Sequence, residues 1–173
     1  NDGSGQFGSQ QVIYTAAWHS QSVYAADPDG DGDMDVLSAS NYYSHGKITL
    51  YKNDGSGKFG SQQVISTAVD GANSVYAADL DGDGNLDILS TSSDHGSNDK
   101  IAWYKYVPRQ FGSQQVITTE TDWVKTVYAA DLDGDGDLDV LSASEGDKKI
   151  AWYENDGSGQ FGSQQVITTS VDR

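Results

Sequence analysis

The chain has 173 residues, of which 26 are aspartate or glutamate and 10 are lysine or arginine, and its formal net charge is −16. Such an acidic surface repels polyanions, which excludes electrostatically driven binding to nucleic acid or to an anionic membrane. The chain contains no cysteine, so it has no disulfide and no cysteine-based metal site, and no apolar stretch approaches the ~20 residues of a membrane span.

The sequence repeats itself with a period near fifty residues. A Phe-Gly-Ser-Gln-Gln-Val-Ile segment begins at four positions, which are Phe7, Phe59, Phe111 and Phe161. A period of this length indicates a propeller, a solenoid or an array, in which each unit buries its apolar face against a neighbour. We treat residues 1–173 as one repeat domain, made of repeats 1–52, 53–105 and 106–154 and a partial fourth repeat, 155–173.

Four short β-strands are predicted in each repeat, separated by turn-forming clusters of Gly, Asp, Asn and Ser. In the first repeat they are Gln10–Ile13, Ser22–Ala26, Met34–Ser40 and Lys47–Tyr51, with equivalents in the later copies. No helical periodicity of 3.6 residues runs between them. Four strands in about fifty residues make the unit of a propeller blade, so we predict an all-β fold of four-stranded antiparallel blades.

Counting these strands gives three complete blades and one surplus outer strand, because the chain starts with an outer-strand segment from Phe7 to Ile13. Propellers close with four to eight blades, so three blades leave two raw faces and unpaired strand edges. We expect the chain to be part of a longer repeat chain. The alternative is the non-covalent assembly of copies into a ring or a filament.

The turn between the second and third predicted strands has the pattern Asp-x-Asp-Gly-Asp-Gly-x-x-Asp in all three repeats. Carboxylates at loop positions 1, 3, 5 and 9 can converge on one centre, with a backbone carbonyl from position 7. Oxygen ligands alone suit Ca²⁺ better than Mg²⁺, which prefers a smaller, water-rich shell. We predict three Ca²⁺, one in each of acidic loop 1 (Asp27, Asp29, Asp31, Asp33, Asp35), acidic loop 2 (Asp79, Asp81, Asp83, Asn85, Asp87) and acidic loop 3 (Asp131, Asp133, Asp135, Asp137, Asp139).

Two alternatives to this metal site are weaker. An EF-hand needs flanking helices and a glutamate at loop position 12, where this chain has Ser38, Ser90 and Ser142. Simple acidic hairpin turns are common, because Asp-Gly is a frequent turn dipeptide. Three copies with the same nine-residue spacing argue against that reading, since the clustered carboxylates would repel one another without a cation.

The Phe-Gly of Phe7-Gly8, the Asp-x-Asp-Gly-Asp-Gly-x-x-Asp loop and the 52-residue spacing resemble the FG-GAP or VCBS repeat, the blade of integrin-α-type propellers. The resemblance covers essentially the whole chain. It implies seven-bladed propellers as the common form, one Ca²⁺ in a loop of several blades, an extracellular location and a role in adhesion or ligand binding. Some secreted polysaccharide lyases and fungal lectins carry similar propellers, so the fold does not fix the function.

The repeats differ most in two sets of loops, which a four-stranded meander places at the end opposite the acidic loops. Exposed aromatic and polar side chains there are typical of a surface that grips a sugar ring or a protein, although drift in unconstrained loops explains the differences equally well. Trp103 and Trp152 lie in predicted strands, where packing is the better explanation. The candidate ligand face comprises Trp18, His19, Tyr42, Tyr43, His45, Asp94, His95 and Trp123.

These features predict a calcium-stabilised extracellular module for adhesion, protein interaction or structural assembly, with a protein or glycan ligand and further repeats or copies as partners. The alternative is a lectin-like carbohydrate-binding propeller or the propeller of a secreted polysaccharide lyase. We expect no enzyme activity, because the three histidines occupy unlike positions and bound calcium would keep the carboxylates ionised. The turn Tyr106-Val107-Pro108-Arg109 replaces Asn-Asp-Gly-Ser-Gly and predicts a different turn geometry.

Overall fold

The structure is a computed structural model that describes residues 4–6, 8–15, 19–41, 45–93 and 99–170. In these ranges its regular structure consists of fourteen β-strands. Twelve strands form three four-stranded antiparallel sheets, and the remaining two form a small hairpin. None of the described residues belongs to a helix that is long and apolar enough to cross a membrane. The predicted all-β fold of four-stranded antiparallel sheets is confirmed.

Each sheet is a meander whose strands follow chain order from one edge to the other. Blade 1 consists of β1 (Ser20–Ala26), β2 (Asp35–Ser40), β3 (Lys47–Tyr51) and β4 (Gln63–Ser66). Blade 2 consists of β5 (Ala72–Ala78), β6 (Asp87–Ser92), β7 (Lys100–Tyr104) and β10 (Gln115–Thr118). Blade 3 consists of β11 (Val124–Ala130), β12 (Asp139–Ser144), β13 (Lys149–Tyr153) and β14 (Gln165–Thr168). The fourth strand of every blade therefore comes from the Phe-Gly segment that follows its first three strands.

The segment that we predicted as a surplus outer strand is not a strand. Residues 8–15 have no strand assignment and are exposed, although Gln10–Ile13 was predicted to be one. The same four residues recur as Gln164–Ile167, and there Gln165–Ile167 belong to β14, paired with β13. The two segments are identical in sequence, so the difference is tertiary: β14 pairs with the edge of β13, whereas Gln10–Ile13 pairs with no strand among the described residues.

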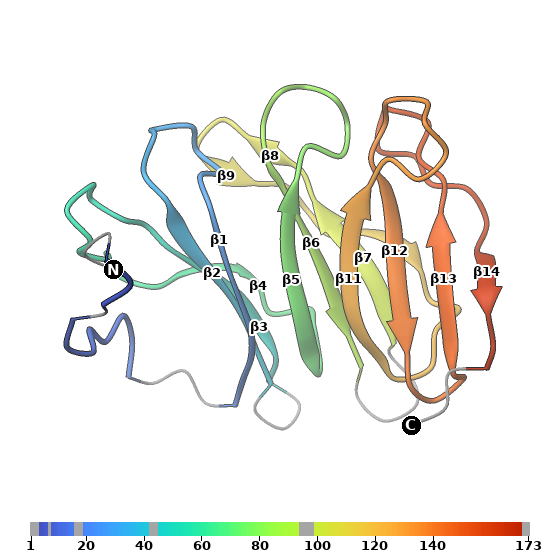
Figure 1. Cartoon of the computed structure of the whole chain (residues 1–173), viewed down its shortest axis with the longest axis horizontal. Helices are drawn as coiled ribbons and strands as arrows, with labels where there is room; N and C mark the ends of the chain where they lie inside the picture. The colour runs from blue at the N-terminus through green and yellow to red at the C-terminus, as the bar shows by residue number, and fades with distance from the viewer. Residues whose placement is uncertain (1–3, 7, 16–18, 42–44, 94–98, 171–173) are drawn as a thin grey trace.

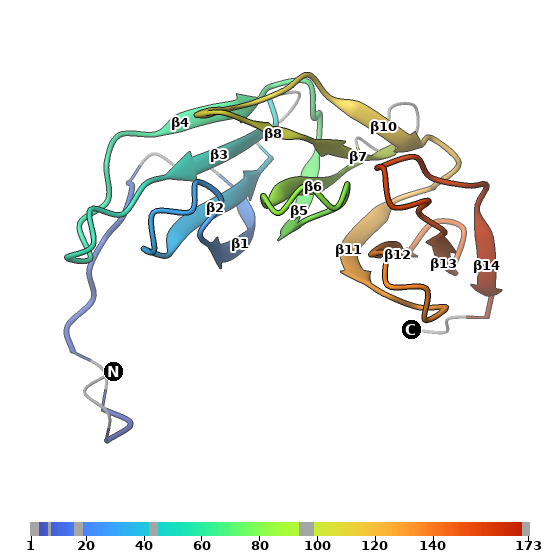
Figure 2. The ribbon, with the colours of Figure 1, turned by 90° about the horizontal axis from the view of Figure 1, so that it is seen from above.

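The three blades stand side by side in an arc, with β5 between β1 and β11 on the inner side and β4, β10 and β14 on the outer side (Figures 1 and 2). The turns that leave β1, β5 and β11 all emerge at the top edge in Figure 1. The strand ends around Ser20 and Ser40 lie at the opposite edge, since Ser20 pairs with Ser40 and Ala26 pairs with Asp35. The acidic loops and the variable loops therefore occupy opposite ends of the blades.

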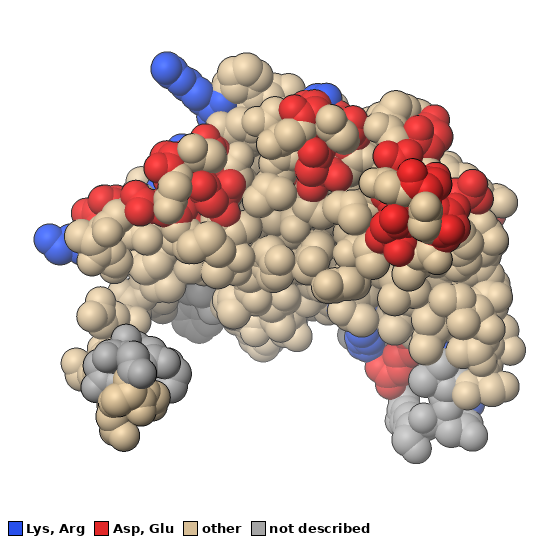
Figure 3. All heavy atoms as spheres, turned by 45° about the horizontal axis from the view of Figure 1, so that its top comes forward, with Lys and Arg blue, Asp and Glu red and all other residues tan. Residues whose placement is uncertain are grey.

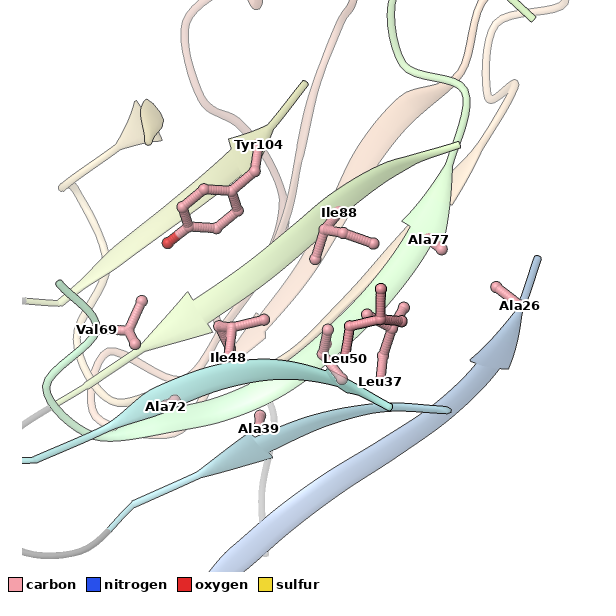
Figure 4. Close-up of a cluster of buried hydrophobic side chains, with 11 residues drawn as sticks. Ala26, Leu37, Ala39, Ile48, Leu50, Val69, Ala72, Ala77, Ile88 and Tyr104 are labelled. Atoms are coloured by element: carbon pink, nitrogen blue, oxygen red, sulfur yellow. The ribbon is translucent and has the colours of Figure 1, made fainter. Parts of the chain in front are cut away.

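The apolar core lies in two layers, one at each joint between blades. The first layer packs Leu37 and Ile48 of blade 1 against Ile88 of blade 2, as Figure 4 shows. The second layer packs Leu89 of blade 2 against Val140 of blade 3. Alternating residues of β6 face opposite neighbours, and all six are buried. Each large apolar side chain buried in this way contributes about 1.5–3 kcal/mol, so the blades stabilise one another.

Three tyrosines at equivalent positions of the inner strands form a ladder across the blades. The ring centroids of Tyr24 and Tyr76 are 4.6 Å apart, and those of Tyr76 and Tyr128 are 4.8 Å apart. Tilted ring pairs at such distances are favourable beyond the area they bury. Burial, together with the neighbouring tyrosine hydroxyls, raises the pKa of the Tyr76 phenol well above its usual value. The ladder ends at Tyr128, whose ring is half exposed on blade 3.

The turn after the third strand differs in blade 2, as predicted from Pro108. Blades 1 and 3 close this turn with a single bridge, Asn53 to Phe59 and Asn155 to Phe161. Blade 2 instead forms the hairpin of β8 (Tyr106–Val107) and β9 (Gln110–Phe111). Proline presets the first turn residue, and Arg109 takes a positive φ of 72° at the second.

Candidate metal centres and ligand face

The acidic loops form three separate patches along one edge of the molecule, one over each blade (Figure 3). Each loop brings at least three carboxylate oxygens within 4.8 Å of one another. In loops 2 and 3 these oxygens come from positions 1, 3 and 9, and in loop 1 from positions 1, 3 and 5. The nine residues are Asp27, Asp29, Asp31, Asp79, Asp81, Asp87, Asp131, Asp133 and Asp139.

The first aspartate of each loop makes the chain curl. In loop 2, Asp79 Oδ1 accepts a hydrogen bond from the Asp83 N–H at 3.1 Å, and Asp79 Oδ2 accepts one from the Gly84 N–H at 2.9 Å. Gly82 and Gly84 take positive φ values of 69° and 87°, which the curl requires and which glycine adopts without strain. Asp27 accepts the equivalent pair from Asp31 and Gly32, whereas Asp131 accepts from Gly134 and Gly136.

The ninth position of each loop is a buried aspartate at the start of the second strand of its blade. Asp87 Oδ2 accepts from the Leu80 N–H at 3.1 Å, and Asp87 Oδ1 accepts from the Tyr106 N–H at 2.8 Å. Asp139 makes the same two bonds to the equivalent backbone groups of blade 3. Loop 1 differs because Pro28 replaces the leucine and has no N–H to donate. Asp35 Oδ2 is therefore buried without a hydrogen-bond partner.

Burial disfavours the charged form of two of these aspartates, Asp87 and Asp35. It raises the pKa of Asp87 to about 6, against the opposing effect of the two backbone hydrogen bonds, and the charges of Asp81 and Asp83 raise it further. Burial also raises the pKa of Asp35, and the charges of nearby acidic groups reinforce the shift. Carboxylates held together at this density are stable as anions only when a cation neutralises them.

Three buried carboxylate oxygens in the acidic loops have no hydrogen-bond partner, which indicates that a cation would be favourable there. Asp29 Oδ1, Asp35 Oδ2 and Asp81 Oδ1 are inaccessible to water and accept no hydrogen bond. The Asp81 side chain is only 6% exposed. A buried carboxylate oxygen without a partner lowers the stability of the fold, so a positively charged ligand beside these atoms would be favourable. Oxygen donors alone, several of them charged, are the set that Ca²⁺ prefers.

A lysine reaches into two of the three loops, which the sequence analysis missed. Lys52 pairs with Asp29, and Lys105 pairs with Asp81 and, at 3.0 Å, with Asp83. The equivalent residue of blade 3 is Glu154, which accepts a hydrogen bond from Gln165 Nε2 at 3.2 Å. All three residues directly follow the third strand, so the signal was present in the alignment of the repeats as a change from lysine to glutamate.

The other predicted metal residues lie beside the trios. Asp33 and Asp137, at position 7, lie against the glycines of the following turns: a Cβ built on Gly55 would be 2.6 Å from Asp33 Oδ2. Asn85 differs from them, because its Nδ2 donates to Asp83 Oδ1 at 2.8 Å. Asp83 and Asp135 accept backbone hydrogen bonds from their own loops, and Asp35 accepts one from the Asn53 N–H in the turn after β3.

The candidate ligand face is described only in part, since Trp18, Tyr42, Tyr43, Asp94 and His95 lie outside the described residues. His19 and His45 are exposed, and Trp123 is half-buried with Lys125 Nζ at 5.5 Å from its ring centroid. His19 and Trp123 share one position of the repeat, where both take a positive φ, 51° and 54°. Blade 2 has Gly71 there, with a φ of 68°. Two blades thus hold a side chain at a backbone position that favours glycine, which is typical of functional surfaces.

Comparison with known protein families shows which family the chain belongs to. The model of the FG-GAP-like repeat matches three segments, residues 29–90, 86–142 and 131–173. The chain belongs to the FG-GAP-like repeat family. The three matches of this FG-GAP chain begin or end in its acidic loops and together cover most of its length. A search of curated proteins gave no match.

A solved structure shares the FG-GAP chain's fold. It is a lectin from Agrocybe aegerita, described as recognising non-reducing terminal N-acetylglucosamine. The two superpose with a TM-score of 0.58 at 22% sequence identity, over 86% of this chain and 38% of the lectin. The chain therefore spans well under half the length of that protein. At this level of identity the likeness shows a shared fold.

Proposed function

We propose that this FG-GAP chain is a calcium-stabilised β-propeller module that acts outside the cell by binding a ligand. The observation that carries the proposal is the repeated carboxylate trio, within 4.8 Å in every blade, together with buried oxygens that lack a partner. In each loop, the aspartates of the trio would hold the ion, with Asp35 available beside the trio of loop 1. The ion supplies positive charge that fixes the turn and lets buried carboxylates stay ionised.

The proposed calcium is structural. Ligand binding to the folded state alone adds RT ln(1 + [L]/Kd), about 2.7 kcal/mol at a hundred-fold excess over Kd for one site. Millimolar extracellular calcium saturates weak loops that cytosolic calcium leaves empty, which supports an extracellular location. Carboxylates held ionised by calcium are poor general acids, which supports binding rather than catalysis.

Calcium titration of the chelator-treated protein tests the proposal. We expect three calcium ions per chain by titration calorimetry, and two for Asp81→Asn, which removes a charged ligand of loop 2. Asp122→Asn is the matched control, because Asp122 is an exposed aspartate outside the three loops, and it keeps three sites. The assignment is contradicted if the native chain gives no heat of calcium binding. It is also contradicted if Asp81→Asn binds as many calcium ions as the native chain.

A lectin-like role is the second candidate, as a particular form of the ligand binding. It is supported by the shared fold with a lectin and by Trp123 and His19, which occupy a positive-φ position at the end opposite the acidic loops. Partly exposed aromatic rings suit stacking on a sugar. A glycan array with the native chain and with Trp123→Ala separates the alternatives: a carbohydrate-binding module loses signal in the variant, and a module for protein ligands gives none with either.

A further inference from the structure

Apolar positions that are buried at the joints between blades are exposed at the two ends of the arc. The head face is the side of blade 1 turned away from blade 2, and it carries Val23, which is 69% exposed. The equivalent valines at the two inner joints, Val75 and Val127, are 3% and 4% exposed. The tail face is the side of blade 3 turned away from blade 2. Its Leu132 is 43% exposed, whereas the equivalent Leu80 is 1% exposed.

Ordinary surface positions do not show this difference between blades. Val64, Val116 and Val166 occupy one position of the fourth strand, and all three are about half exposed. Exposure at Val23 and Leu132 therefore reflects a missing neighbour rather than a surface position. The face that each of them belongs to is built to pack against a blade.

The joint between blades 2 and 3 has two specific contacts. The ring of Trp103 in β7 packs against Gly159 of blade 3 so closely that a Cβ on that glycine would lie 2.5 Å from it. Asn155 Nδ2 of blade 3 also donates a hydrogen bond to the Leu80 carbonyl of blade 2 at 2.7 Å. The tryptophan of blade 2 thus packs on the last glycine of the Asn155–Gly159 turn, whose asparagine holds the Leu80 carbonyl.

Both halves of this joint recur at the ends of the arc. The tail face carries Trp152, half-buried, at the position of Trp103. The head face carries the turn Asn53–Gly57, with the sequence of Asn155–Gly159, and a Cβ on Gly57 would meet nothing within 4 Å. Asn53 Nδ2 donates to Met34 O at 3.2 Å, as Asn155 does within its own blade, and keeps a second hydrogen for another carbonyl.

The joint between blades 1 and 2 is of another kind. Leu50 takes the place of the tryptophan there, and the β8–β9 hairpin takes the place of the glycine turn. Within the chain, tryptophan is therefore paired with the glycine turn and leucine with the hairpin. The ends of the arc carry the first combination, one half each, so they are complementary to each other.

We propose that the tail face of one copy of this chain binds the head face of a second copy, in a joint that reproduces the joint between blades 2 and 3. In it the Trp152 ring packs on Gly57 of the second copy, and Asn53 of the second copy donates to the Leu132 carbonyl. Two copies provide six blades, within the four to eight of closed propellers, and a head-to-tail joint that does not close continues as a filament. The inference is independent of calcium binding.

The amino-terminal segment is compatible with this joint. Residues 1–13 have the same sequence as residues 155–167. The segment that precedes β1 corresponds, in the repeat, to the outer strand of the preceding blade, which would be blade 3 of the other copy. Because the two sequences are identical, the amino-terminal segment would present the same residues to β13 of the other copy as β14 does.

Sedimentation velocity of the chain of residues 1–173 in calcium buffer, up to about 100 μM protein, tests the proposal. We expect the native chain to sediment as two or more copies. Val23→Asp on the head face and Trp152→Asp on the tail face each give a monomer. Val116→Asp is the matched control, because it places the same charge at a half-exposed valine outside both faces, and it sediments as the native chain does. A native chain that is monomeric throughout overturns the inference.

Mixing the two variants distinguishes head-to-tail binding from other modes. Val23→Asp retains its tail face and Trp152→Asp retains its head face, so their mixture forms a dimer although each alone is monomeric. A Val23→Asp variant that dimerises by itself shows tail-to-tail binding and overturns the proposal. Circular dichroism verifies that each variant folds, and Leu132→Gln replaces Trp152→Asp if the latter does not. Calcium titration of the same samples keeps failure of assembly distinct from failure of the calcium proposal.

Discussion

Lys52, Lys105 and Glu154 occupy the same position, directly after the third strand of each blade. The two lysines place an ammonium group among the carboxylates of loops 1 and 2, and loop 3 has a glutamate instead. An ammonium group in the cluster must be displaced before a divalent cation can bind, and the displaced lysine loses its ion pairs. Loop 3 should therefore bind calcium most tightly of the three.

Exchange of these residues tests the ranking. Lys105→Met removes the competing charge, and we expect calcium to bind loop 2 roughly ten-fold more tightly, which corresponds to about 1.4 kcal/mol. Glu154→Lys should weaken loop 3 by a similar factor. Lys58→Met, at an exposed lysine of the turn that follows β3, is the control and leaves all three affinities unchanged. Affinities from calorimetry that do not respond to Lys105→Met contradict the competition.

The raised pKa of Asp87, about 6, gives the metal-free protein a defined pH dependence. A carboxyl that binds its proton more tightly when folded stabilises the fold fully below its unfolded pKa of 3.8 and loses that contribution as the pH rises through about 6. Asp35 shifts in the same direction. In chelator, lowering the pH from 7 to 5 should therefore raise the free energy of unfolding by about 1 kcal/mol.

Thermal unfolding at both pH values, with chelator and with calcium, measures this effect. Calcium competes with the same proton, so its stabilisation should shrink at pH 5. The pKa values of Asp54, Asp83 and Asp156 are lowered from 3.8, so these groups change the stability only at pH values below the interval from 5 to 7. A chelated protein that becomes less stable between pH 7 and pH 5 would show that the aspartates are not buried as described.

At the scale of the single element, glycines at one position of two turns have different surroundings. Gly57 and Gly159 have φ values of 80° and 77°, but only Gly159 lies against a tryptophan. An alanine at such a φ costs about 1–2 kcal/mol in either turn, and overpacking against Trp103 adds about 1–3 kcal/mol. We expect Gly159→Ala to destabilise the chain more than Gly57→Ala, by urea unfolding of both variants under conditions that keep them monomeric. Equal losses would contradict the close packing of the blade 2–blade 3 joint.

The elements also show which parts of the fold the sequence could predict. The bounds of β3 agree with the prediction, and β1 and β2 begin within two residues of it, because their turns are marked by Asp, Gly and Asn. Gln10–Ile13 was mispredicted, although the identical Gln164–Ile167 contributes to a strand, because local sequence cannot tell whether a neighbouring edge is free. The lysines in loops 1 and 2 were missed for a related reason, since a contact between residues 24 positions apart is set by the register of the strands.

At the scale of the whole molecule, the repeat period predicted the blades and their order. The strand count predicted that the first and last blades each expose a face that would otherwise pack against another blade. What the sequence comparison of repeats did not show is that these faces match each other. That match rests on Trp152, Leu132, Gly57 and Asn53, whose counterparts Trp103, Leu80, Gly159 and Asn155 meet inside the chain. The pairing emerges only when the blades are placed side by side.

Thermal unfolding with and without calcium tests the central claim, that calcium stabilises the propeller, most directly. The native chain is unfolded at neutral pH in excess chelator and again in millimolar calcium, with magnesium at the same concentration as the control. A site saturated a hundred-fold adds about 2.7 kcal/mol, so the account predicts that calcium raises Tm by at least roughly 5 °C and that magnesium raises it much less. The same Tm in chelator and in calcium would contradict it.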